Sequence, residues 1–141
     1  MKYLIIILAV SLMYGCQTDT YETDKTDYDL IDYDNGIKVR VEYGDIPTLY
    51  TFTSAWTRIQ ECSGLTYYAP FIVVVKDIEG PADALYFSDG VIVIQRDSLK
   101  YGKLIQHEML HHLLNKNGMS EESSNHTSYL FDLCVPGTTI K

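Results

Sequence analysis

Four short segments have the hydrophobic pattern of β-strands. From Ile37 to Tyr43, hydrophobic and polar residues alternate, which predicts a strand with one buried and one exposed face. Residues 71–77 hold a run of β-branched residues too short for a helix, so we expect a buried strand there. Hydrophobic runs at residues 84–88 and 91–95 flank Asp89-Gly90, a dipeptide that accepts the positive φ angles of a two-residue hairpin.

A helix is predicted between the first two strands. Over residues 47–63, hydrophobic residues recur every three or four positions, as on one face of an amphipathic helix. Pro47 suits the first turn, and Gly64 suits the position just beyond the end.

A second helix follows the hairpin. Asp97 or Ser98 can cap its start, and it runs to about Lys116 and stops at Gly118. The tail beyond is irregular, with a short helix around residues 128–133. This order of elements predicts an α+β fold, in which a small, mostly antiparallel sheet packs on two helices.

The first residues are expected to lie outside the folded domain. Residues 1–15 carry one positive charge, at Lys2, and a hydrophobic run of about a dozen residues, shorter than the roughly twenty that span a membrane. The ending Gly15-Cys16 resembles a bacterial lipoprotein signal, which implies a lipid on Cys16, although Met13 stands where that family usually has Leu. The alternative is ordinary secretion with cleavage nearby. Both predict export, and the first places the protein in the cell envelope on a bacterial membrane.

Charge and cysteine content narrow the function further. Residues 16–35 hold six Asp and one Glu against one Lys, which predicts a disordered tether, so the folded domain would be residues 36–141. The net charge of the chain is −8, which does not favour a nucleic-acid partner, and we expect a monomer. Cys62 and Cys134 are expected to pair in an exported domain, the alternative being two buried thiols.

The second helix carries a metal-site motif, His107-Glu108-Met109-Leu110-His111. Positions four apart on a helix project side by side, so His107 and His111 can hold one ion while Glu108 lies close to it. This His-Glu-x-x-His spacing is typical of zinc peptidases. His112 projects elsewhere and is read as a packing residue.

A catalytic zinc ion needs a third protein ligand and one open position. His126, after a glycine and a polar turn, is our candidate; Glu121 and Glu122 are the alternatives, and a site without a third protein ligand is another. Tyr129 is a weaker candidate for stabilising an oxyanion, and Asp132 for holding a ligand histidine.

The stretch "HEMLHHLL", followed by "NHTSYLFDLC", resembles a group of small secreted bacterial proteins of the zincin type of metallopeptidase. In that group a downstream histidine, an aromatic residue and a cysteine follow the motif; here these are His126, Phe131 and Cys134. The resemblance implies that His126 is a ligand and that a Cys62–Cys134 disulfide holds the tail. Thr127 stands where that group often has proline.

These observations predict a membrane-tethered zinc peptidase with one Zn²⁺ held by His107, His111 and His126. Glu108 would take a proton from water as it attacks a peptide carbonyl, then pass it to the leaving amine. By the resemblance, either residues 84–88 or residues 91–95 would pair with an extended peptide substrate. The alternative is a non-enzymatic envelope lipoprotein whose metal site is structural or serves binding.

Overall fold

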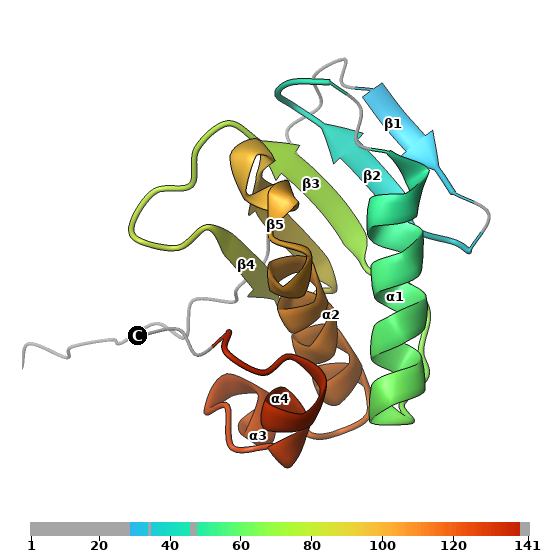
Figure 1. Cartoon of the computed structure of the whole chain (residues 1–141), viewed down its shortest axis with the longest axis vertical. Coiled ribbons are helices and arrows are strands. Elements are labelled where there is room, and N and C mark those ends of the chain that lie inside the picture. Colours follow the sequence, from blue (N-terminus) through green and yellow to red (C-terminus); the bar gives the residue numbers. More distant parts are fainter. Residues whose placement is uncertain (1–28, 34, 46–47, 139–141) are drawn as a thin grey trace, which may run out of the picture.

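Five strands form one mixed sheet in the computed structural model, which describes residues 29–33, 35–45 and 48–138 (Figure 1). In spatial order they are β1 (Asp29–Asp32), β2 (Lys38–Val41), β3 (Phe71–Val75), β5 (Val91–Gln95) and β4 (Ala84–Phe87). The α+β class is confirmed. The sheet is mixed rather than mostly antiparallel, because β2, β3 and β5 run parallel and only the two edge strands are antiparallel to their neighbours. A helix between β2 and β3 supplies the long connection that parallel strands need.

Strand β1 lies in the segment that was predicted to be part of a tether. It pairs antiparallel with β2, and the turn between them is closed by the Tyr33 N–H, which donates to Ile37 O over 2.9 Å. Of its side chains, Ile31 packs against the core, so the strand depends mainly on backbone pairing, which composition does not reveal. The folded domain therefore reaches at least to Asp29 instead of beginning at residue 36. The predicted signal peptide and the Cys16 lipid site lie outside the described residues.

Two long helices pack on the same face of the sheet, α1 (Leu49–Ser63) and α2 (Gly102–Lys116) (Figure 1). Both were predicted. Helix α1 buries Phe52, Trp56 and Ile59, and it ends at Gly64, whose φ of 68° allows its N–H to donate to Gln60 O. Helix α2 is buried on most sides. No helix in the described part of the chain is long and hydrophobic enough to cross a membrane.

The start of α2 differs from the prediction. A short 3₁₀ helix, η1 (Arg96–Lys100), precedes it, and the two are separated at Tyr101, whose φ and ψ are −92° and 82°. Asp97 and Ser98 therefore lie in η1 and do not cap α2. Helix α2 ends at Lys116, as expected.

The β4–β5 hairpin has a three-residue loop, not the two-residue loop that was predicted. Phe87 pairs with Val91, which leaves Ser88, Asp89 and Gly90 between the strands. Gly90 adopts a φ of 99°, and its N–H donates to Phe87 O, whereas Asp89 keeps a negative φ and its carboxylate accepts from the Val91 N–H. A turn followed by glycine with positive φ is the usual geometry of a three-residue loop.

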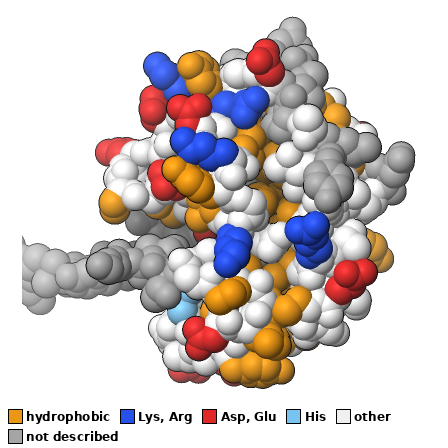
Figure 2. All heavy atoms as spheres, in the orientation of Figure 1, with side chains coloured by type: hydrophobic (Ala, Val, Ile, Leu, Met, Phe, Trp, Pro, Cys, Tyr) orange, Lys and Arg blue, Asp and Glu red, His pale blue; other side chains and the backbone are white. Residues whose placement is uncertain are grey.

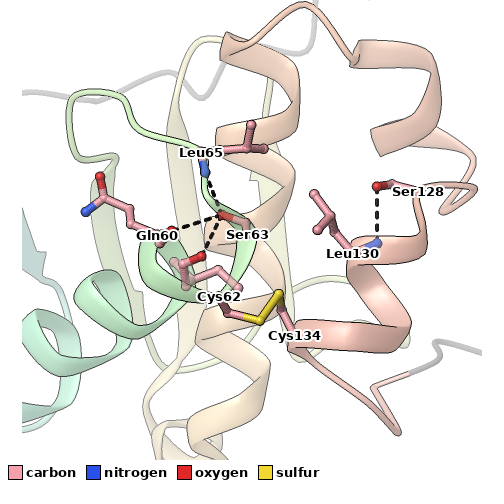
Figure 3. Close-up of a disulfide and its surroundings, with 8 residues drawn as sticks. Gln60, Cys62, Ser63, Leu65, Ser128, Leu130 and Cys134 are labelled. Atoms are coloured by element: carbon pink, nitrogen blue, oxygen red, sulfur yellow. Dashed lines mark hydrogen bonds between the residues drawn. A yellow bond between two sulfur atoms is a disulfide. The ribbon is translucent and has the colours of Figure 1, made fainter.

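Beyond α2 the chain forms two short helices, α3 (Ser120–Ser124) and α4 (Tyr129–Cys134). Helix α4 corresponds to the short helix predicted near residues 128–133, and Ser128 caps it by accepting the Leu130 N–H at 3.3 Å. Helix α3 was not predicted. The Cys62–Cys134 disulfide is confirmed, with a Cα–Cα distance of 5.7 Å, and it joins the end of α1 to the end of α4 (Figure 3).

Candidate metal centre

Three imidazoles converge beside α2. The Nε2 atom of His107 lies 3.1 Å from Nε2 of His111 and 3.1 Å from Nε2 of His126, and the three ligand atoms are all within 4.8 Å of one another. Ligand nitrogens at Zn–N distances of 2.0–2.1 Å in a tetrahedral site lie about 3.3 Å apart. The three histidines could therefore hold one metal ion, and no movement of the backbone is needed to bring them together.

Helical geometry places the first two ligands. His107 and His111 are one turn apart on α2 and are nearly inaccessible to water, with exposed fractions of 1% and 8%. The third ligand is positioned differently. His126 follows α3 with a φ of 53°, the only positive φ of a non-glycine residue in the described chain, and its side chain is exposed.

The backbone around His126 closes the end of α3. The His126 N–H donates to Ser123 O at 3.2 Å and the Thr127 N–H donates to Glu122 O at 3.0 Å, which is the paired hydrogen-bond pattern of a Schellman motif. In that motif His126 occupies the position where glycine is usual. Glu121 and Glu122, the alternative ligands, lie on α3, both exposed and outside the histidine cluster.

Two hydroxyl groups contact the rings of His107 and His111 at Nδ1, the ring nitrogen that faces away from the cluster. Thr138 Oγ1 lies 2.9 Å from Nδ1 of His107, and Ser123 Oγ lies 2.9 Å from Nδ1 of His111. Sequence reasoning missed both residues and named only Asp132, as a weaker candidate, for this role. Asp132 lines a small cavity of about 60 Å³ beside His107 and His126 but, within the described chain, makes no hydrogen bond to a ligand ring.

Phe131 supports the cluster from α4. The centroid of its ring lies 5.0 Å from that of His107, 4.9 Å from that of His111 and 4.8 Å from that of His126. One aromatic side chain thus packs against all three ligand rings and covers them with a dry surface, which strengthens electrostatic interactions at the site.

Burial keeps the two helix ligands neutral. It lowers the pKa of His107 to about 4, with a further contribution from His126, and it lowers the pKa of His111 to about 3, with further contributions from His107 and His126. At neutral pH both rings therefore keep an unprotonated nitrogen, the form that binds metal ions.

Glu108 lies on α2 beside the first of these histidines. Its side chain is 3% exposed and lines a cavity of about 360 Å³ together with His111 and His126. Within the described chain its carboxyl group makes no hydrogen bond, and burial raises its pKa to about 8. A carboxyl group of this kind can exchange a proton near neutral pH.

The same cavity runs along β4. Ala84, Leu85 and Tyr86 line it, and Ala82 and Ala84 also line a second cavity of about 260 Å³ that reaches Leu104 and Thr138. Of the two strands that were candidates for pairing with a substrate, β4 is at the edge of the sheet and β5 is interior.

The remaining candidates lie elsewhere. His112 is buried, donates from Nε2 to Tyr68 O at 2.8 Å and contacts the Trp56 ring, in keeping with the packing role expected of it. Tyr129 is 72% exposed and lines none of the three cavities described here. Helix α4, which carries Tyr129, lies in the lower part of the molecule (Figure 1), where hydrophobic side chains gather on the face shown in Figure 2.

Comparisons with protein-family models, with curated protein sequences and with solved structures gave no match. The resemblance noted from the sequence therefore rests on the motif and its downstream residues alone.

Proposed function

We propose that this protein is a zinc-dependent peptidase, attached to a bacterial membrane through a lipid on Cys16. The observation that carries the proposal is the convergence of three imidazole nitrogens next to a cavity that Glu108 also lines. Three nitrogen ligands with room for a fourth are typical of catalytic zinc. A structural zinc site would need a fourth protein ligand, and the cluster found in the described chain has three members.

Zinc, when bound, supplies a Lewis acid that polarises a carbonyl group and acidifies water. Glu108 takes the proton from the attacking water and then delivers it to the departing amine. Its buried position serves both steps, because a raised pKa makes the carboxyl group an effective acid as well as a base near neutral pH. Phe131 and the aliphatic side chains of α2 exclude water from the back of the site.

Strand β4 offers a way to hold an extended peptide across the centre. In the described sheet β4 is an edge strand whose one neighbour is β5, and an edge is where an extended substrate can add as a further strand. Ala82 and Ala84 line both cavities, and such small side chains leave space for a chain to pass from one cavity to the other. This arrangement favours a peptide or protein substrate bound in extended form.

Replacing Glu108 tests the proposal. We expect the purified wild-type protein to hold one zinc ion and to cleave members of a peptide library. Glu108→Gln should keep the zinc, because Glu108 is not a ligand, and should lose at least about 100-fold in cleavage rate, because the proton acceptor is gone. Zinc content by metal analysis and cleavage by mass spectrometry measure the two effects, with Glu121→Gln on exposed α3 as the control.

Two results would contradict the peptidase. Full activity in Glu108→Gln would remove Glu108 from the mechanism. Zinc binding by the wild-type protein without cleavage of any library peptide would favour the alternative, a non-enzymatic envelope lipoprotein that uses the same three histidines to bind metal.

A further inference from the structure

The hydroxyl group of Thr138 determines which nitrogen of His107 carries hydrogen. Thr138 Oγ1 donates its single proton to Val135 O, 2.6 Å away. The oxygen therefore faces Nδ1 of His107, at 2.9 Å, with a lone pair and can only accept. Nδ1 of His107 must carry the hydrogen, so in the neutral ring Nε2 has a free lone pair.

Ser123 acts in the same way on His111. Its Oγ donates to the backbone oxygen of His111 at 3.3 Å and lies 2.9 Å from Nδ1 of the same residue. Ser123 is buried, so water does not compete for these bonds. With the hydroxyl proton directed to that backbone oxygen, Ser123 Oγ accepts from Nδ1 of His111, which leaves Nε2 with its lone pair.

The two lone pairs face each other. Nε2 of His107 and Nε2 of His111 are 3.1 Å apart, and a hydrogen bond between them would require one ring to carry hydrogen on both nitrogens. A cation between the nitrogens removes the repulsion, so the hydroxyl groups prepare the site for a metal ion before it arrives.

We propose that Ser123 and Thr138 are positioning residues of the metal centre, each of which orients one ligand imidazole with its Nε2 lone pair towards the ion. This inference rests on the proposed metal site, though not on peptide hydrolysis. Ser123 lies on α3, and Thr138 lies in the segment after α4 (Figure 1). Each of these two parts of the chain therefore contacts one of the two ligand histidines on α2. Because both acceptors are neutral, they orient the rings without adding negative charge, which leaves the ion a stronger Lewis acid than carboxylate partners would.

The test compares zinc affinities. We expect Thr138→Val and Ser123→Ala each to weaken zinc binding about 10–100-fold, measured by competition with a chromophoric chelator. Thr138→Ser, which keeps the hydroxyl, should bind within about threefold of wild type. Ser124→Ala is the matched control. Ser124 is the neighbour of Ser123 on α3 and lines the same cavity of about 360 Å³, but its hydroxyl group donates to Ser120 O and does not contact a ligand ring.

A spectrum of the cobalt-substituted protein separates orientation from general loss of structure. Thr138→Val and Ser123→Ala should shift the visible cobalt bands, whereas Thr138→Ser and Ser124→Ala should not. Urea unfolding of the metal-free variants reports any loss of folding. Should Ser123→Ala fail to fold, Thr138→Val alone decides, since Thr138 is only half-buried.

The outcomes separate this inference from the peptidase proposal. Wild-type affinity in both Thr138→Val and Ser123→Ala would overturn the positioning role, as would an equal loss in Ser124→Ala. A wild-type protein that binds zinc but cleaves nothing would contradict only the peptidase. A wild-type protein that binds no zinc would overturn both.

Discussion

At the scale of a single residue, the backbone conformation that brings His126 to the candidate site lowers the stability of the fold. It occupies the position after α3 where glycine is usual, with a φ of 53°. Left-handed backbone brings the Cβ of any other residue close to the following carbonyl oxygen, which costs about 1 kcal/mol. This conformation directs the His126 ring back towards α2, so that its Nε2 lies 3.1 Å from Nε2 of His107.

Two substitutions at His126 separate the metal ligand from the backbone strain. His126→Gly and His126→Ala should both lose high-affinity zinc binding, because each removes a ligand. The metal-free glycine variant should be more stable than the alanine variant by about 1 kcal/mol, since glycine adopts this φ without strain. Chelator competition and urea unfolding measure the two properties, and an alanine variant as stable as the glycine variant would show that the backbone is unstrained.

At the scale of elements, α4 connects the site to the rest of the fold. Its last residue forms the disulfide with α1 (Figure 3). Its Phe131 packs against the three histidine rings, and the segment after it carries Thr138. A helix of six residues is too short to be stable by itself, so its position depends on these attachments. The disulfide should therefore support metal binding as well as folding.

Replacing both cysteines tests this link. The disulfide closes a loop with a sequence separation of 72, and Cys62→Ser/Cys134→Ser should lower the free energy of unfolding by about 4 kcal/mol in the chain-entropy model. Zinc affinity should fall as well, because α4 and Thr138 are held less firmly. Urea unfolding and chelator competition give the two values, with the wild-type protein under reducing conditions as the comparison. Unchanged zinc affinity would mean that packing alone holds α4.

At the scale of the whole molecule, the buried site couples folding to pH. His107 and His111 have pKa values of about 4 and 3 in the folded protein against 6.5 for an ordinary histidine. Between these values the unfolded chain binds more protons, so stability falls as the pH drops from about 6.5 towards 3. Glu108 has the opposite effect, since its pKa of about 8 exceeds the ordinary 4.5 and the folded protein binds the extra proton. Its contribution to stability is lost as the pH rises from about 4.5 to 8.

The metal-free protein should therefore lose stability on both sides of an intermediate pH. We expect urea midpoints measured in the presence of a chelator to fall on acidification below about pH 6.5 and on raising the pH towards 8. Glu108→Gln should flatten the alkaline side, and His107→Gln combined with His111→Gln should flatten the acidic side. If neither side responds to its variant, other groups control the pH dependence.

Much of the fold could be predicted because its signals are local. The helical spacing of α1, the β-branched run of β3 and the turn residues between β4 and β5 each lie within one short window of sequence. The parallel order of β2, β3 and β5 could not be predicted, because it depends on which strands meet after the connections are made. Strand β1 and helix α3 were missed for a related reason, since backbone pairing and the turn after α2 stabilise them more than a hydrophobic face of their own.

The sequence by itself determined the pair His107 and His111 with Glu108 beside them, because the helix geometry that aligns positions four apart is the same in any α-helix. It also predicted the pairing of Cys62 with Cys134, since these are the two cysteines of the predicted domain, and the structure contains that disulfide. Only the tertiary structure decided that His126 completes the cluster and that the hydroxyl groups of Ser123 and Thr138 contact the rings of His111 and His107. It alone placed β4 at the edge beside the cavity. These contacts join residues far apart in the chain, and their geometry depends on packing that no local pattern contains.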